Sequence, residues 1–178
     1  MSTRDLLQAA ERDAIISRCQ RFRYWLMRRW QSGPRLLFMM LNPSTADATV
    51  DDRTIRRCVG FAHAAGFGSI AVVNLFAFRA TKPADLARTG WQIGPDADIY
   101  IRSALDGSQA VCVAWGAIGT GNAAEQRVQR VMPMILAAGH EPQCLRITRS
   151  GYPQHPLYLP GDCTLQPYSL GAIQEAMG

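Results

Sequence analysis

Hydrophobic residues gather in four runs along the chain, and each run has the length of a strand. The runs cover residues 35–41, 69–75, 109–116 and 143–148. From Leu36 to Leu41 the first run is apolar without a break, as expected for a strand that is covered on both faces. The pattern therefore predicts a central sheet built from these strands.

Between the runs, apolar residues recur at helical spacing. Helices are predicted over residues 4–18, 51–62, 83–87, 95–105 and 123–138. Thr3 is a suitable N-cap for the first helix, and Pro133 should kink the last one or start a new segment. Because helices alternate with strands, the pattern predicts an α/β domain with a mainly parallel, four-stranded central sheet.

Residues 21–30 begin with arginine and aromatic residues in alternation, which predicts a strand of a different kind. A half-exposed antiparallel strand at the edge of the sheet fits this alternation. The turn residues 32–34 should fold it back into a hairpin with residues 35–41. No repeat or linker divides the sequence, so residues 1–178 are expected to form a single domain.

The balance of charge permits a polyanionic partner. The chain has 19 Lys and Arg against 14 Asp and Glu, a net charge of +5, and an isoelectric point near 9.2. Such a balance is compatible with binding to nucleic acid. Lys82 is the only lysine, however, so a general codon preference for arginine is an equally good explanation of the cation content.

The cysteines and the N-terminus indicate a reduced compartment. The five cysteines are scattered and form no C-x-x-C pair, so reduced core thiols are expected, with no metal site and no cofactor. Residues 2–18 mix charges throughout, unlike a signal peptide, and no apolar run approaches the length of a membrane helix. The sequence predicts a cytoplasmic protein without a membrane partner.

Candidate functional residues stand at or just beyond the ends of the predicted strands. They are Asn42, Pro43, Ser44 and Thr45 after the first strand, Asn74 in the second, Trp115 and Gly116 in the third, and His155 and Tyr158 after the fourth. Ligands of an open parallel sheet bind beyond the carboxyl ends of its strands. These amide, hydroxyl and imidazole groups include no nucleophile–base pair and no carboxylate dyad. They are suited to orienting a water, pairing with a planar heterocycle and stabilising developing negative charge.

The order of these segments resembles the uracil-DNA glycosylase superfamily over about residues 35–160. The matching segments are Leu-Asn-Pro-Ser at 41–44, Val-Val-Asn-Leu at 72–75, Ala-Trp-Gly at 114–116 and His-Pro-Leu-Tyr at 155–158. The chain looks still more like an uncharacterised bacterial family known only as a domain of unknown function. That second resemblance rests on residues 42–47, 51–57 and 73–79 and implies no activity.

The glycosylase resemblance implies a three-layer α/β/α sandwich and hydrolysis of an N-glycosidic bond. By position, Asn42 would orient the attacking water, Asn74 would pair with the edge of the base, and His155 would stabilise the negative charge on the departing base. The base would enter flipped out of its strand, as in DNA repair. Tyr158 or Leu157 would be the wedge that fills the vacated stack.

The sequence also departs from the superfamily pattern. Leu41 or Met40 stands where the family has glycine, and neither Ser44 nor Thr45 is the aromatic residue that excludes thymine in the most uracil-selective branch. Selectivity for uracil is therefore not implied. Residues 157–159 replace the usual Ser-Pro continuation, so a phosphate-binding hydroxyl is missing.

Each candidate also has a structural interpretation. Asparagine before proline, as at Asn42, commonly opens a turn. A buried amide such as Asn74 needs either a hydrogen-bond network or a ligand. His155 would suit a solvated loop, and Phe76 and Phe78 would serve in core packing as well as in stacking on a base.

Three functions are compatible with these residues. The first is a glycosylase that removes a deaminated or damaged base from DNA, either double-stranded or single-stranded. The second is a hydrolase of free nucleosides or nucleotides, and the third is a non-catalytic binder of nucleic acid or nucleotides on the same scaffold. The sequence leaves the oligomeric state open.

Overall fold

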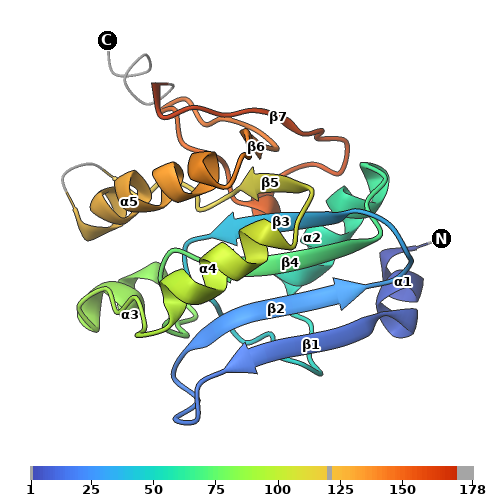
Figure 1. Ribbon diagram of the computed structural model, residues 1–178, viewed down its shortest axis with the longest axis horizontal. Coiled ribbons are helices and arrows are strands. Elements are labelled where there is room, and N and C mark those ends of the chain that lie inside the picture. Colours follow the sequence, from blue (N-terminus) through green and yellow to red (C-terminus); the bar gives the residue numbers. More distant parts are fainter. Residues whose placement is uncertain (1, 120–121, 172–178) are drawn as a thin grey trace.

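The computed structural model describes residues 2–119 and 122–171 and forms one seven-stranded sheet flanked by helices (Figure 1). The strand order is β1-β2-β4-β3-β5-β6-β7. The strands are β1 (Glu11–Ile16), β2 (Arg23–Arg29), β3 (Arg35–Met40), β4 (Ser69–Asn74), β5 (Ala110–Val113), β6 (Pro142–Cys144) and β7 (Gln166–Pro167). The helices are α1 (Thr3–Ala9), α2 (Arg53–Ala64), α3 (Pro83–Arg88), α4 (Ala97–Asp106), α5 (Ala123–Ala137) and the short 3₁₀ helix η1 (Pro156–Tyr158).

The four predicted central strands are confirmed as the parallel part of this sheet. β4, β3, β5 and β6 lie side by side and are parallel, with Phe38 of β3 opposite Val72 of β4 and Cys112 of β5. The side chains of these three residues are fully buried. An unbroken apolar run is thus explained, because both faces of β3 and β4 are covered.

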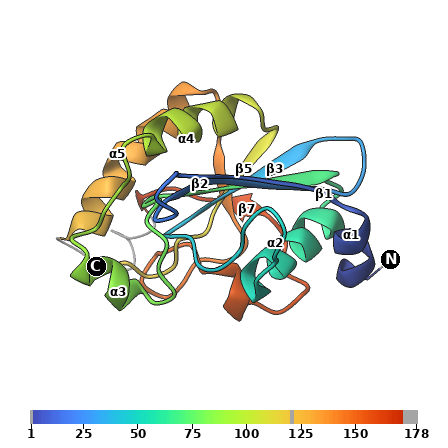
Figure 2. The same ribbon diagram turned by 90° about the horizontal axis from the view of Figure 1, so that it is seen from below.

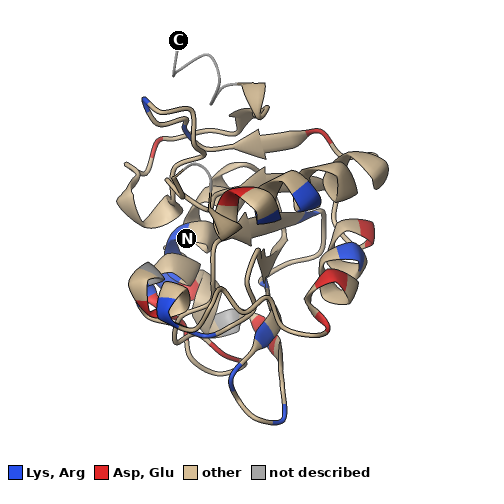
Figure 3. Cartoon of the chain, turned by 90° about the vertical axis from the view of Figure 1, so that its left-hand side faces the viewer, with Lys and Arg blue, Asp and Glu red and all other residues tan. Residues whose placement is uncertain are grey.

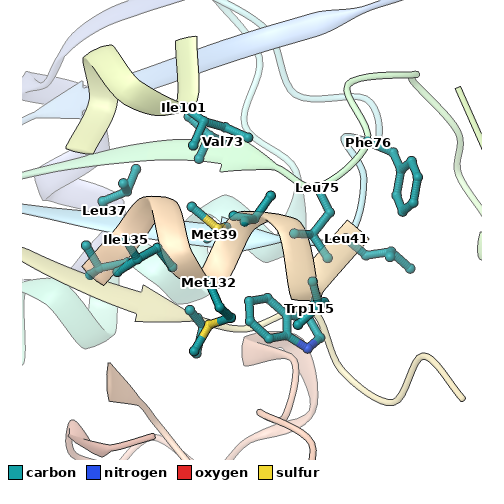
Figure 4. Close-up of a cluster of buried hydrophobic side chains, with 14 of the residues drawn as sticks. Leu37, Met39, Leu41, Val73, Leu75, Phe76, Ile101, Trp115, Met132 and Ile135 are labelled. Carbon is teal, nitrogen blue, oxygen red and sulfur yellow. The ribbon is translucent and has the colours of Figure 1, made fainter. Parts of the chain in front are cut away.

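Helices cover both faces of the sheet, which confirms the predicted α/β architecture. α4 and α5 lie over one face and α1 and α2 over the other (Figure 2). On the first face Leu37, Met39 and Val73 pack with Ile101 and Ile135 (Figure 4). On the second face, alternate residues of the same strands pack with α1 and α2. The alternation of side chains along each strand therefore divides one apolar run between two cores.

The N-terminal prediction was wrong beyond the first helix. The expected helix 4–18 ends at Ala9, and Glu11–Ile16 forms β1. Ser2, rather than Thr3, is the N-cap, in a reciprocal pair of hydrogen bonds with Asp5. Residues 11–16 become a strand because β2 offers them an antiparallel partner, in a register that places Glu11 opposite Arg29.

The predicted edge strand exists, but its position was wrong. β2 pairs with β1 on one side and with β4 on the other, so it is internal and the hairpin joins β1 to β2. After the turn at residues 32–34 the chain enters β3, which lies on the opposite side of β4 from β2. β3 therefore does not pair with β2. Arg23 and Arg28 of β2 are buried, which the expectation of a half-exposed strand did not include.

The C-terminal elements differ from the expectation in detail. α5 continues through Pro133 as a single helix. The fourth parallel strand is short: β6 ends at Cys144, and Ile147 instead forms an antiparallel bridge with Pro153. Within the described ranges, no helix combines the length and the apolar character needed to cross a bilayer.

Candidate functional site

A cavity of about 630 Å³ lies beyond the ends of β3 and β5. Figure 3 faces this edge of the molecule, where basic and acidic positions are mixed along loops and helices. The lining residues come from six segments: Arg23 of β2; Met40 at the end of β3 with Leu41, Asn42, Ser44 and Thr45 after it; Asp52–Arg56 at the start of α2; Ala80 and Thr81; Trp115–Ala117 after β5; and His155, Leu157 and Tyr158. Because β3 and β5 are parallel neighbours, the residues that follow them meet at this edge.

Asn42 reaches the cavity with its amide already oriented. Its Nδ2 donates to the carbonyl oxygen of Ala80 at 2.7 Å and to that of Pro43 at 3.1 Å. Both partners are acceptors, so the amide nitrogen must face them. Among the described residues, none hydrogen-bonds the Asn42 carbonyl oxygen Oδ1. The side chain therefore presents an acceptor in the wall of the cavity.

His155 is oriented by the 3₁₀ helix that follows it. Its Nδ1 accepts a hydrogen bond from the backbone N–H of Leu157 at 3.3 Å, which places the ring proton on Nε2. Burial lowers the pKa of His155, while the negative charge of Asp52 acts in the opposite direction. The imidazole is therefore neutral at neutral pH and can donate from Nε2.

Gly116 allows the chain to turn between Trp115 and the cavity. Its φ of +77° favours glycine, and a Cβ there would lie 3.6 Å from the Cβ of His155. Trp115 is buried and packs edge-on against Tyr168. The end of β5 thus places one aromatic side chain and a backbone turn in the wall beside His155.

The remaining predicted lining residues lie toward the solvent. Ser44 is half-buried and Thr45 is exposed. Tyr158 is 74% exposed, and its ring centre lies 5.8 Å from that of His155. A large aromatic side chain at this degree of exposure is unusual, and its position beside His155 makes it the rim of the cavity.

Four predicted site residues do not line the cavity. Asn74 is buried, and its Oδ1 accepts from Nη2 of Arg23 at 3.3 Å, so it lies behind the wall that Arg23 forms. Pro43 contributes its carbonyl oxygen to Ala80 and Asn42. Phe76 packs on Trp91, and Phe78 packs edge-on against Phe22. The side-chain contacts of the two phenylalanines are those of core packing.

The candidate site residues named from the sequence did not include the charged part of the wall. Arg23 is buried on β2, and Arg53 and Arg56 project from the first turn of α2 beside Asp52. Asp52 caps α2, with its Oδ1 accepting from the backbone N–H of Ile55 at 2.9 Å. The sequence did contain a signal for Arg53 and Arg56. A helix was predicted to begin soon after the Asn42 segment, so its first turn had to lie near the same strand end.

Arg23 remains positively charged in this setting. Burial lowers its pKa to about 10, and the negative charge of Asp52 partly offsets that effect. The guanidinium is still protonated at neutral pH. In residues 2–119 and 122–171, no group of three His, Cys, Asp or Glu side chains is placed to hold a metal ion.

Comparisons with known proteins support the nearer of the two resemblances. Searches of curated proteins and of solved structures each return no significant match, so no relative supports the likeness to uracil-DNA glycosylases. A family model does match residues 23–157, a segment that starts at Arg23 and ends at Leu157 in the cavity wall. The family is described as a protein of unknown function (DUF1643), and the chain belongs to it.

Proposed function

We propose that the chain hydrolyses the N-glycosidic bond of a nucleotide unit bound in this cavity. The observation that carries the proposal is that two polar side chains with fixed orientations line the same cavity. Asn42 presents a side-chain carbonyl oxygen that accepts no hydrogen bond from a described residue, and His155 presents a ring N–H. The first is suited to hold a water and the second to donate to an anionic leaving group.

The two groups would act on opposite sides of the bond that breaks. The bond between the sugar carbon and the base nitrogen breaks, and the base leaves with the electron pair. The Nε2–H of His155 donates a hydrogen bond to the negative charge that develops on the base. The water held by Asn42 forms the new bond to the sugar carbon, and its extra proton passes to solvent. The amide of Asn42 cannot accept a proton from the water. The bond to the departing nucleobase must therefore break ahead of the attack by water.

The size and composition of the cavity are consistent with a nucleotide unit. A volume of about 630 Å³ falls in the range of small-molecule sites. Leu41, Ile55 and Trp115 supply apolar wall, and Tyr158 at the rim is available to stack on a base. The nucleotide would be either part of a DNA strand, with a deaminated or damaged base, or free in solution.

Non-catalytic binding of a nucleotide is the second candidate, and the position of Asn74 favours it. Asn74 lies behind Arg23 and does not line the cavity, so the side chain proposed to read the edge of the base is absent from the wall. A site without this reader would still bind a nucleotide through its arginines and aromatic rim. Base release separates the two candidates.

Base release is measured by chromatography after incubation with DNA oligonucleotides that carry uracil or other altered bases, and with free nucleosides and nucleotides. We expect release from at least one substrate class. Asn42→Ala and His155→Asn should each lower the rate by about 100-fold or more, the usual contribution of a positioned catalytic group. Binding without release by the folded wild type would favour the second candidate and refute hydrolysis.

A further inference from the structure

Arg23 differs from the other buried arginines in the described part of the chain. Arg28 is paired with Asp51 at 2.7 Å, and Arg127 is paired with Asp98 at 2.5 Å. Arg23 is 2% exposed, yet no carboxylate lies within ion-pair distance of it among the described residues. A buried charge without a counterion is costly, so an arginine in this state needs an anion from another source.

The hydrogen bonds of Arg23 do not neutralise it. Nη1 donates to the carbonyl oxygen of Ala46 at 3.0 Å, and Nη2 donates to Oδ1 of Asn74 at 3.3 Å. Both acceptors are neutral. Nε is buried and has no hydrogen-bond partner in the described part of the structure. The two bonds fix the guanidinium in the cavity wall, but no carboxylate in the described part of the structure forms an ion pair with it.

The cavity over Arg23 contains further positive charge. Arg53 and Arg56 also line it, and Asp52 is the single lining carboxylate among the described residues. With His155 neutral, these described lining side chains carry two positive charges in excess. The partial positive charge at the N-terminus of α2, a helix of 12 residues, adds to this potential. Hydroxyls of Ser44, Thr45 and other threonines in the wall supply neutral donors.

We propose that this wall is a subsite for a phosphate monoester, held between Arg23 and the first turn of α2. At neutral pH a monoester carries a charge close to −2, which matches the excess positive charge of the wall. A backbone phosphodiester carries only −1 and leaves part of that charge unmatched. This inference rests on the proposed nucleotide function and narrows its substrate to a nucleoside monophosphate. The monoester belongs either to a free nucleotide or to the phosphorylated end of a strand.

Calorimetry with the full chain tests the subsite, using nucleoside 5′-monophosphates and the matching nucleosides as probes. Loss of a charged hydrogen bond to phosphate is worth about tenfold or more in affinity, so monophosphates should bind at least that much more tightly. Arg53→Gln should reduce this preference by up to about fivefold. Arg130→Gln removes another exposed helical arginine, outside the cavity, and should leave the preference unchanged.

Arg23→Met removes the buried cation and should abolish most of the preference. Because Arg23 also binds Ala46 and Asn74, this variant requires a thermal melt to show that it folds, and Arg53→Gln tests the subsite without that risk. A 5′-phosphorylated oligonucleotide, compared with the same oligonucleotide without the phosphate, distinguishes a strand end from a free nucleotide as the source.

The outcomes separate this inference from the proposed hydrolysis. Equal affinity for nucleosides and monophosphates, or no binding of either, would overturn the subsite. Base release without a preference for monophosphates would overturn the subsite and leave hydrolysis standing. A preference for monophosphates that Arg53→Gln weakens, without base release, would support the subsite and count against hydrolysis.

Discussion

Buried arginines on β2 serve two different ends, although only four residues separate them in sequence. Arg28 is fully buried, and its Nε donates to Oδ1 of Asp51 at 2.7 Å. Its guanidinium also donates to the carbonyl oxygens of Met27 and Asp47. Arg28 is therefore satisfied within the fold and ties β2 to the segment before α2. Arg23, without a carboxylate, is left to interact with the contents of the cavity.

Removal of the Arg28 counterion should be costly. Asp51→Ala leaves a buried guanidinium unpaired and should lower the free energy of unfolding by about 3 kcal/mol. Glu11→Ala is the matched control, because it breaks the solvent-exposed pair with Arg29 and should cost less than about 1 kcal/mol. Urea unfolding of both variants checks the difference. Equal losses of stability would contradict a structural role for the Asp51 pair.

His155 should make folding stability depend on pH. Its pKa in the folded protein lies below the ordinary value of 6.5, so the unfolded chain binds more protons between these two values. The contribution to stability is complete above pH 6.5 and is lost as the pH falls toward the folded pKa. His155→Asn keeps an acceptor for the N–H of Leu157 but does not titrate.

Unfolding free energies of the wild type and His155→Asn, measured at about pH 5 and about pH 8, test this dependence. The loss of stability on acidification should be smaller in the variant. If both proteins lose the same amount, His155 is not buried as a neutral ring.

At the scale of elements, the central strands and the helices between them were predictable, and the N-terminal strand pairing was not. Helix α2 follows from acids at its start and apolar residues on one face, both local features. Residues 11–16 carry no comparable signal, because their strand conformation depends on pairing with β2. The internal position of β2 was likewise hidden, since its arginines are buried against carbonyl groups that lie about twenty residues away in sequence.

Pro133 offers a direct test of how much α5 depends on packing. The proline is exposed and lacks the N–H that would bond within the helix. Pro133→Ala should raise the free energy of unfolding by about 1 to 3 kcal/mol. Pro83→Ala is the control, because Pro83 is the first residue of α3 and needs no helical N–H there. Thermal and urea unfolding measure both. A loss of stability in Pro133→Ala would show that the proline is required by its surroundings.

At the scale of the whole molecule, the sequence predicted where a site would lie but only part of its chemistry. The apolar runs and intervening helices were sufficient for a parallel sheet, and the carboxyl edge of that sheet is where Asn42, Trp115 and His155 meet. The cationic wall was not predictable. Arg23 belongs to a strand that was expected to be half-exposed, and it reaches the cavity because β2 is an internal strand beside β4. The sequence also gave no reason to place Asn74 behind that arginine.

The central claim is that Asn42 positions a water for base release in this cavity. Single-turnover release of free base by excess protein, with the wild type and Asn42→Ala on the same nucleotide substrate, tests it most directly. The predicted result is a rate lower by about 100-fold or more in Asn42→Ala, with substrate affinity nearly unchanged. Equal rates for the two proteins, or no base release by the wild type, would contradict the claim.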